Sequence, residues 1–544
     1  MAEEIFDVLI VGGGLSGLAA GNYLFDRNEK RFLILEARDR VGGRTCTIDY
    51  KQHSVDVGGA YVGPFQNRIL RLAREFNIRT YRVNNKGKNV LTLSNGIRSE
   101  YQGTIPTSLG VFGLLDLNYL LCRTQELSEQ ISNLAPWSNE DLSLKFDGMT
   151  VEDWLQTIGE TEEAKDIYRA AVRTILCVEP NEVSMFAWLS YVNNGLGIMR
   201  LCEVENGAQE RKFSGGSQQI SDRLREKLGF DRVLLNHSVK HIEWSPTSNL
   251  VRITCANNQV FSSRHAIIAL APSLYKTIQF NPELPAKKRE ATERMYMGSI
   301  IKTITVFKRP YWREKGYSGS VLNTSRDTHP VVFSYDDTSD EDHFYAIMGF
   351  IVADSSRKWA KQTRDERRQA VCEQYAQAFQ CNELLINCEE YIEQNWSAEE
   401  FSGGCYTDIM PKNVLSSLRE QLSASCGDRG QLSFAGTELA TRFSGYMDGA
   451  VQAGERAAFE VLTKYLRMEG KDADVEWVNE EPTDAREECR SSDITKLMYG
   501  PSKIESILPK ASTAKYILQI AQIAGVGLIG LAAIVLNHNY FDSA

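Results

Sequence analysis

The chain has 544 residues, more than one hydrophobic core usually holds, so at least two structural units are expected. Its formal net charge of -10 leaves no surplus of Lys and Arg to neutralise phosphates, which argues against a nucleic-acid-binding protein. The eleven cysteines include no CxxC pair and the seven histidines show no ligand spacing, so neither a disulfide framework nor a metal site is expected.

The N-terminal segment predicts a βαβ unit. Residues 6–11 form a short apolar run that predicts a strand, residues 15–27 predict a helix, and residues 31–36 predict a second strand. The residues before the first strand are acidic and do not resemble a secretory signal.

The loop after the first strand is glycine-rich and reads Gly12-Gly13-Gly14-Leu15-Ser16-Gly17. In the GxGxxG pattern the first glycine permits a tight turn, the second lets the backbone approach a pyrophosphate, and the third packs helix against strand. Glu36 ends the next strand, where a carboxylate accepts hydrogen bonds from an adenosine ribose. NAD and FAD share this loop, so the loop alone leaves the cofactor open.

The middle of the chain predicts helices over residues 115–131 and 150–174 and a strand over residues 299–307. In that strand the two-residue period places Lys302 on the apolar face that it shares with Ile300, Ile304 and Val306. A buried lysine costs free energy unless it has a partner or a function. The alternative is a lysine at the strand end that reaches solvent.

The C-terminal region changes composition twice. Residues 469–506 are polar and acidic and predict a connector, whereas residues 516–536 carry no charge. As a helix the second segment spans about 31 Å, close to the hydrocarbon thickness of about 30 Å. Lysines precede it and no Lys or Arg follows, so we expect a tail anchor with the body on the cytoplasmic side. The alternative is a buried amphipathic helix.

Several motifs resemble those of the flavin-dependent amine oxidases, and of monoamine oxidases in particular. They are Arg40-Val41-Gly42-Gly43-Arg44, Ser402-Gly403-Gly404-Cys405-Tyr406-Thr407, Gly436-Thr437-Glu438, Gly445-Tyr446-Met447, Gln209-Glu210-Arg211-Lys212-Phe213 and Asp336-Asp337-Thr338. The resemblance implies an α/β (α+β) fold of two domains, with a Rossmann-like FAD domain, a mixed-sheet substrate domain and a C-terminal transmembrane helix.

The resemblance also implies roles for individual residues. Cys405 would carry FAD covalently as an 8α-S-cysteinyl thioether, Tyr406 and Tyr446 would face each other before the flavin, and Lys302 would hold a water near flavin N5. Trp396 would lie beside the flavin. The implied cofactor-binding residues are Gly12, Gly14, Ser16, Gly17, Glu36, Arg38, Gly43, Arg44, Tyr61, Val239, Trp396, Cys405, Gly436, Gly445, Tyr446 and Met447.

The substrate cavity implied by the resemblance is largely uncharged, so small apolar or aromatic amines are the expected substrates. Its residues are Leu176, Cys177, Cys202, Gln209, Phe333 and Phe350. Cys202 and Phe333 fall where the two vertebrate forms differ, so a preference between indoleamines and phenylalkylamines stays open. The implied reaction converts amine, oxygen and water to aldehyde, ammonia and hydrogen peroxide.

The glycine-rich blocks lie at both ends of the catalytic chain, so we expect discontinuous domains. The FAD domain would use residues 5–83, 214–291 and 399–462, and the substrate domain residues 84–213, 292–398 and 463–497. Residues 498–515 would form a linker, 516–536 the anchor and 537–544 a short tail. The resemblance further implies a homodimer at the outer mitochondrial membrane.

Two rival functions belong to the same fold. Polyamine oxidases and histone demethylases would need acidic residues for the extra positive charge, and they lack the Ser-Gly-Gly-Cys-Tyr block. Non-enzymatic prenyl-GTPase chaperones hold no flavin, and the intact Glu36, Cys405 and paired tyrosines argue against that class.

Overall fold

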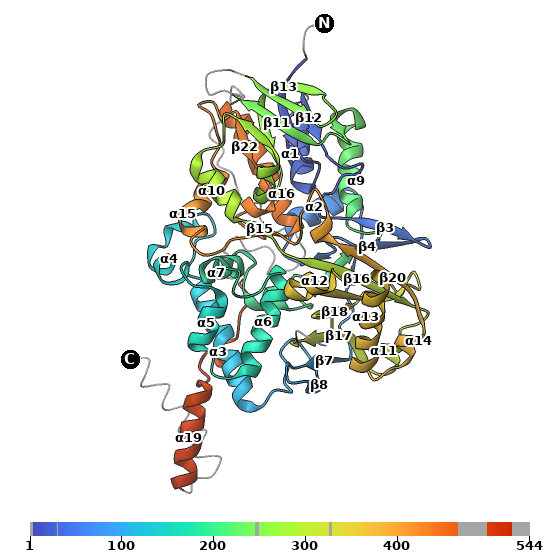
Figure 1. Cartoon of the computed structure of the whole chain (residues 1–544), viewed down its shortest axis with the longest axis vertical. Helices are drawn as coiled ribbons and strands as arrows, with labels where there is room; N and C mark the ends of the chain where they lie inside the picture. The colour runs from blue at the N-terminus through green and yellow to red at the C-terminus, as the bar shows by residue number, and fades with distance from the viewer. Residues whose placement is uncertain (1–3, 30, 245–249, 326–328, 466–497, 525–544) are drawn as a thin grey trace.

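The computed structural model describes residues 4–29, 31–244, 250–325, 329–465 and 498–524 (Figure 1). The predicted βαβ unit is confirmed within about one residue at each end. β1 (Ile5–Val11) leads into α1 (Leu15–Asp26), and β2 (Phe32–Leu35) lies parallel to β1.

The first sheet has the strand order β10-β2-β1-β13-β12-β11-β14, with β22 pairing to β13. Its other members are β10 (Val233–Leu234), β11 (Val239–Trp244), β12 (Val251–Cys255), β13 (Val260–Ile268), β14 (Gln279–Asn281) and β22 (Leu432–Phe434). All of these strands fall within the three ranges expected for the FAD domain.

Side chains of β1 alternate between the two faces of this sheet, as the two-residue period of a strand requires. Val8 and Ile10 pack against α1, α9 (Gln218–Leu228) and α16 (Met447–Glu460). Leu9 and Val11 pack on the opposite face, with α10 (Ala286–Arg294) and α15 (Leu415–Ser423). Both faces of β1 are therefore buried, so only the loops at the ends of the strand can contact a ligand.

The second sheet has the order β20-β16-β19-β18-β17-β7-β8. Its strands are β7 (Lys88–Thr92), β8 (Arg98–Tyr101), β16 (Ile300–Phe307), β17 (Tyr317–Asn323), β18 (Phe333–Asp336), β19 (Tyr345–Val352) and β20 (Cys388–Asn395). All of its pairings are antiparallel except that between β17 and β7. The strand predicted over residues 299–307 is confirmed as β16.

Helices cover both faces of the second sheet. One face meets α3 (Val111–Ser128), α6 (Glu162–Leu176) and α7 (Met185–Asn194), and the other meets α13 (Arg364–Ala378). The helix predicted over 115–131 is α3. The helix predicted over 150–174 is two helices, because α5 (Val151–Ile158) ends at Gly159 and the Asp116 carboxylate binds the N–H groups of the next two residues before α6 begins.

The C-terminal part that the structure describes contains α18 (Lys503–Ser506) and α19 (Ala511–Ala524). α19 lies at the end of the molecule opposite the N-terminus and contacts α3 (Figure 1). Residues 516–524 of the expected anchor are helical, while residues 525–536 and the tail lie outside the described residues. In the described ranges no helix has both the length and the apolar character needed to cross a bilayer.

Candidate active site

A cavity of about 570 Å³ runs between the two sheets, from the glycine loop after β1 to the aromatic face of the second sheet. One end is lined by Gly12, Gly14, Ser16, Glu36, Arg38, Gly43 and Arg44, and the other by Tyr61, Lys302, Phe333, Phe350, Trp396, Tyr406 and Tyr446. Cys405 lines the same cavity. The structure therefore brings together in one space residues that the sequence separates by more than 400 positions.

The glycine loop has the geometry that a dinucleotide requires. A Cβ atom on Gly17 would lie 1.9 Å from the Gly12 carbonyl oxygen, so the third glycine allows the close contact of helix and loop. Gly14 caps α1 without a side-chain hydrogen bond, which leaves the first-turn N–H groups for an anion. Gly17 itself does not line the cavity, as expected for the glycine that packs the helix against the strand.

Glu36 lies at the cavity end of β2 and is held in place by the loop. The Gly13 N–H donates to Glu36 Oε2 at 2.6 Å, and the Arg38 N–H donates to Glu36 Oε1 at 2.8 Å. Burial raises the pKa of this carboxyl, while Arg38 and the two backbone donors oppose the shift. A fixed acceptor beside the glycine loop fits the ribose of a dinucleotide.

The two arginines at this end also hold distant chain segments. Arg44 donates to the Tyr406 carbonyl oxygen at 2.8 Å and to Glu438 Oε1 at 2.5 Å. Arg38 donates to Glu399 Oε2 at 2.6 Å. The resemblance implied a cofactor-binding role for both arginines and did not indicate these carboxylate partners. These contacts position the segments that carry Cys405, Tyr406 and the second glycine block, where Gly436, Gly445 and Met447 line the cavity.

Cys405 is buried beside the cavity after a turn that requires glycine. Gly404 has φ +146°, and a Cβ atom there would lie 2.3 Å from the Gly298 carbonyl oxygen. The Cys405 N–H donates to the same oxygen at 3.0 Å. Burial raises the pKa of the Cys405 thiol to about 12, and the positive charges of Arg44 and Arg38 oppose the shift.

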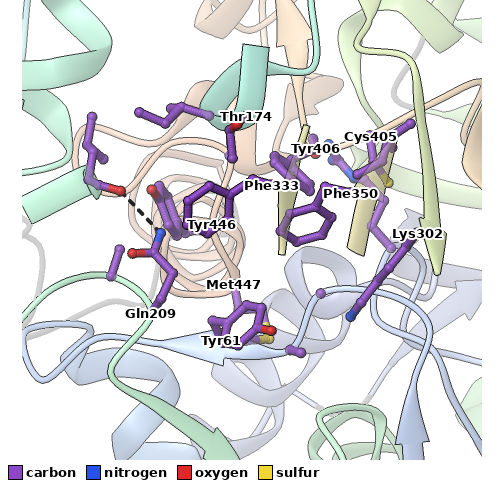
Figure 2. A pocket seen from close by; sticks show the side chains of 18 of the residues that line it. Tyr61, Thr174, Gln209, Lys302, Phe333, Phe350, Cys405, Tyr406, Tyr446 and Met447 are labelled. Carbon is purple, nitrogen blue, oxygen red and sulfur yellow. Dashed lines mark hydrogen bonds between the residues drawn. The ribbon is translucent and has the colours of Figure 1, made fainter. Parts of the chain in front are cut away.

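Tyr406 and Tyr446 both line the aromatic end of the cavity, which we call its inner end (Figure 2). The Tyr406 ring packs edge-on against Phe350, with ring centroids 5.8 Å apart. The Tyr446 ring stacks on Tyr191 at 6.4 Å. Burial raises the pKa of both phenols, so both stay neutral at physiological pH. Each ring is supported by a separate aromatic partner that also lines the cavity.

Lys302 lies on β16 with only 4% of its surface exposed, so the alternative of a strand-end lysine in solvent is wrong. Its ammonium donates to the Gly58 carbonyl oxygen at 2.8 Å and lies 5.9 Å from the centre of the Tyr61 ring. Burial lowers the pKa of Lys302 to about 8, a shift that Asp337 opposes and Lys212 reinforces. Trp396 is buried close by and donates to the Val57 carbonyl oxygen at 2.9 Å.

Four of the six expected cavity residues, Cys202, Gln209, Phe333 and Phe350, line the cavity. Gln209 donates to the Leu201 carbonyl oxygen at 3.2 Å (Figure 2), and its own Oε1 accepts no hydrogen bond from the described residues. Such a buried acceptor, without a donor among the described residues, would gain a partner from the N–H group of a ligand.

Leu176 and Cys177 do not line this cavity, which corrects their assignment. Cys177 is completely buried at the end of α6, where its thiol contacts the Tyr406 side chain from behind. Leu176 lines a separate cavity of about 270 Å³. Val239 is also outside the lining, and its side chain packs into the core of the first sheet, which does not test the backbone contact with the cofactor that the resemblance implies for it.

The cavity reaches the protein surface near Glu203 and Glu205, which sequence reasoning missed. Both residues belong to the lining, and Glu205 is exposed. Glu203 accepts a hydrogen bond from the Tyr499 hydroxyl at 3.0 Å, and partial burial raises its pKa. The inner lining is apolar and aromatic, whereas this outer part is acidic.

The sequence model of a family described as "Flavin containing amine oxidoreductase" matches residues 15–462 of the chain. The chain belongs to this family. It is similar to "Amine oxidase [flavin-containing]" of Danio rerio, with 40% identity over 85% of this chain and 87% of the relative. It is also similar to "Amine oxidase [flavin-containing] B" of Homo sapiens, with 40% identity over 84% of this chain and 86% of the relative.

Solved structures agree with this family membership. A putrescine oxidase bound to putrescine superimposes with a TM-score of 0.79 and 26% identity, over 84% of this chain and 99% of the other. Cyclohexylamine oxidase from Brevibacterium oxydans has a TM-score of 0.78 and 29% identity over the same shares of the two chains. The protein is an FAD-dependent amine oxidase. This family membership argues against the rival function of a non-enzymatic chaperone.

Proposed function

We propose that this amine oxidase is a monoamine oxidase that deaminates small apolar or aromatic amines to aldehydes, ammonia and hydrogen peroxide. The observation that carries the proposal is the apolar, aromatic end of a cavity whose other end is built for a dinucleotide. When bound, FAD accepts the two electrons that leave the amine and passes them to oxygen.

The residues of this chain then bind and orient the amine. The Tyr406 and Tyr446 rings flank the inner cavity, and the electron-rich faces of such rings favour an amino group. The unpaired Oε1 of Gln209 accepts an N–H from it. The surrounding apolar side chains exclude water and favour the uncharged amine over the ammonium ion.

Lys302 is the proposed catalytic group for the oxygen half of the reaction. It is the buried amine that reaches the cavity near Cys405, and its lowered pKa lets it exchange a proton near neutral pH. Held by the Gly58 carbonyl oxygen, it can position a water or a reduced oxygen species through its remaining N–H groups.

The covalent attachment of FAD at Cys405 is part of the proposal. Its support is the burial of the thiol in the cavity and the glycine turn that directs it there. Acid-precipitated protein should stay yellow, and the peptide that contains Cys405 should carry the flavin mass. A colourless pellet from fully active enzyme, with an unmodified Cys405 peptide, would refute the attachment.

Diamine oxidation is the second candidate, and a specific observation favours it. Glu203 and Glu205 line the outer part of the cavity, where they suit a second ammonium group. Steady-state rates with benzylamine, serotonin and putrescine separate the candidates. A larger kcat/KM for putrescine than for both monoamines would replace the monoamine proposal.

We also propose that the enzyme is a homodimer held at the outer mitochondrial membrane by residues 516–536, with its body facing the cytosol. The uncharged composition of that segment and the lysines that precede it support the anchor and its orientation, whereas the dimer and the organelle rest on the family resemblance alone. Import of the chain into isolated mitochondria, followed by protease treatment, tests the orientation, because a body that resists protease while the membrane is intact would contradict it.

A further inference from the structure

A pair of cysteines lies on the face of the second sheet that is remote from the cavity. Cys372 belongs to α13 and is 2% exposed, and Cys388 is the partly buried first residue of the edge strand β20. Neither lines the cavity of the active site. Sixteen positions separate them in the chain (388 minus 372), and the packing of α13 on the sheet brings them together.

The packing of α13 over the start of β20 brings the two thiols together, and each shifts the pKa of the other. Arg368 lies one helical turn before Cys372, so both side chains project from the same face of α13. Its guanidinium donates to the Cys388 carbonyl oxygen at 3.1 Å and also contacts the Cys388 sulfur. Cys388 thus has a second thiol and a fixed positive charge as neighbours, and its Sγ donates to the Glu390 carbonyl oxygen at 3.5 Å.

These contacts make one thiol more acidic than the other, so the two have different reactivities. The neighbouring Cys372 thiol and the guanidinium of Arg368 lower the pKa of Cys388, while burial and Glu390 oppose the shift. The Cys388 thiol and burial raise the pKa of Cys372. Among the cysteines of the described ranges, Cys388 is the one whose pKa is lowered; at Cys122, for example, burial raises it to about 11.

We propose that Cys388 and Cys372 form a peroxide-sensitive thiol pair that closes reversibly into a disulfide. The Cys388 thiolate attacks one oxygen of hydrogen peroxide, which breaks the O–O bond and gives a sulfenic acid and hydroxide. The Cys372 sulfur then attacks the sulfenic sulfur. Its proton leaves with the hydroxyl group as water, and the S–S bond forms.

The oxidant is a product of the enzyme's own reaction, since oxygen that takes two electrons and two protons leaves as hydrogen peroxide. A disulfide needs sulfur atoms about 2 Å apart. Cys388 begins an edge strand at a point where the register with β16 shifts, so one end of a strand has to move to close the gap. Closure also protects Cys388 from irreversible oxidation to the sulfinic acid.

The first test uses the full-length holoenzyme and added hydrogen peroxide, so it does not depend on amine turnover. Free thiols are blocked with N-ethylmaleimide and peptides are mapped without reduction. The expected product is a peptide that links Cys372 to Cys388 and that dithiothreitol separates. The inference fails if both cysteines stay alkylated after oxidation, or if Cys388 becomes a sulfinic acid without ever joining Cys372.

Variants then test the two roles. In Cys372→Ser, the sulfenic acid at Cys388 should persist and react with dimedone, whereas in Cys388→Ser the Cys372 thiol should stay reduced. Cys255→Ser is the matched control, because Cys255 is a buried thiol in the other sheet and should leave the link intact. Dimedone labelling at Cys372 in the Cys388→Ser variant would contradict the assignment of the nucleophile.

Removing the charge of Arg368 should shift the pH profile of Cys388 alkylation, which a purely structural role would not affect. Alkylation of Cys388 by iodoacetamide should rise with a midpoint below the ordinary pKa of a cysteine thiol, set by Cys372, Arg368 and Glu390. Arg368→Gln should move that midpoint upward and slow alkylation at neutral pH. Lys361→Gln, in the turn before α13, removes an exposed charge and should leave the midpoint unchanged.

The source of peroxide is tested during turnover. With an amine substrate in air the link should form, and catalase should prevent it. A link that forms equally with catalase would contradict the peroxide step. Absence of peroxide in a coupled peroxidase assay would instead count against amine oxidation, which separates failure of the proposed function from failure of this inference.

Discussion

Lys302 shows how burial prepares one side chain for chemistry. Its ordinary pKa of 10.5 falls to about 8 inside the cavity wall, because the apolar surroundings disfavour the ammonium form. An amine of this pKa is present in both protonation states near pH 8, whereas an exposed lysine is almost wholly charged there.

Lys302→Met should slow flavin reoxidation by oxygen far more than flavin reduction by amine, because the variant removes the N–H donors and keeps the apolar stem. Stopped-flow measurement of each half-reaction provides the check. Lys308→Met is the matched control, since Lys308 follows the same strand but is exposed. Equal rates for wild type and Lys302→Met in both half-reactions would remove Lys302 from the mechanism.

The lowered pKa of Lys302 also predicts a pH dependence of stability. Between about pH 8 and 10.5 the folded lysine is neutral while the unfolded one is still charged, so the unfolded state binds more protons and stability rises with pH. Relative to Lys302→Met, the free energy of unfolding of the wild type should rise by up to about 3 kcal/mol across this window. Chemical denaturation at pH 7.5 and pH 10 measures the difference, and a constant difference would contradict the shift.

Gly404 and Gly403 offer a matched pair of substitutions. Both have positive φ, but a Cβ atom on Gly404 collides with the Gly298 carbonyl oxygen while a Cβ on Gly403 meets nothing within 4 Å. Gly404→Ala should therefore displace Cys405 and reduce covalent flavin content sharply. Gly403→Ala should cost only the backbone strain of about 1 kcal/mol and keep the flavin. Flavin absorbance per mole of denatured protein measures the covalent flavin content of each variant. An equal loss of flavin in both variants would contradict the collision argument.

At the scale of whole elements, the pair of Arg44 and Glu438 joins the N-terminal arginine turn to the second glycine block. Glu438 is 2% exposed and also accepts from Thr407 at 3.2 Å. Glu438→Gln should destabilise the fold by about 3 kcal/mol, because it leaves a guanidinium without its carboxylate. Thermal unfolding compares it with Glu460→Gln, which breaks the more accessible pair with Arg456. An equally small effect in both variants would show that the Arg44 contact is dispensable.

Elements with a strong local pattern were predicted well, and side-chain directions within them were not. The glycine loop, β16 and the inward position of Lys302 follow from spacing, because period and turn geometry act over a few residues. Leu176 and Cys177 were assigned to the cavity, but α6 presents Ala171, Thr174 and Ile175 to it. Residues one position apart on a helix point about 100° apart, and only tertiary packing sets the rotation of the helix.

Contacts between segments far apart in the chain could not be predicted from local sequence patterns, because they too depend on tertiary packing. The carboxylate partner of Arg44 lies 394 positions away, and that of Arg38 lies 361 positions away. No period connects such residues, since their meeting depends on how the two sheets and their helices pack. The same holds for Cys372 and Cys388, whose contact exists because α13 covers the edge of the second sheet.

At the scale of the whole molecule, the surface around α18 favours the proposed membrane association independently of residues 516–536. Ile504, Ile507 and Leu508 are exposed by 73%, 52% and 43%, and Lys503 and Lys510 flank them. Exposed apolar side chains beside lysines suit the interface of an anionic bilayer. We expect the anchor to supply most of the binding and this surface a weaker, salt-sensitive part.

Flotation with anionic vesicles separates the two contributions. The full chain should float at low and high salt, since an inserted helix is held by the hydrophobic effect. A truncation after Lys515 should float only at low salt, and the same truncation with Ile504→Ser and Ile507→Ser should stay in the soluble fraction. Ile386→Ser in the truncated chain is a control for a lost exposed isoleucine away from α18, and it should float as the truncation does. A full chain that stays soluble under every condition would refute the anchor, and a truncated chain indifferent to both serine substitutions would refute the role of the α18 surface.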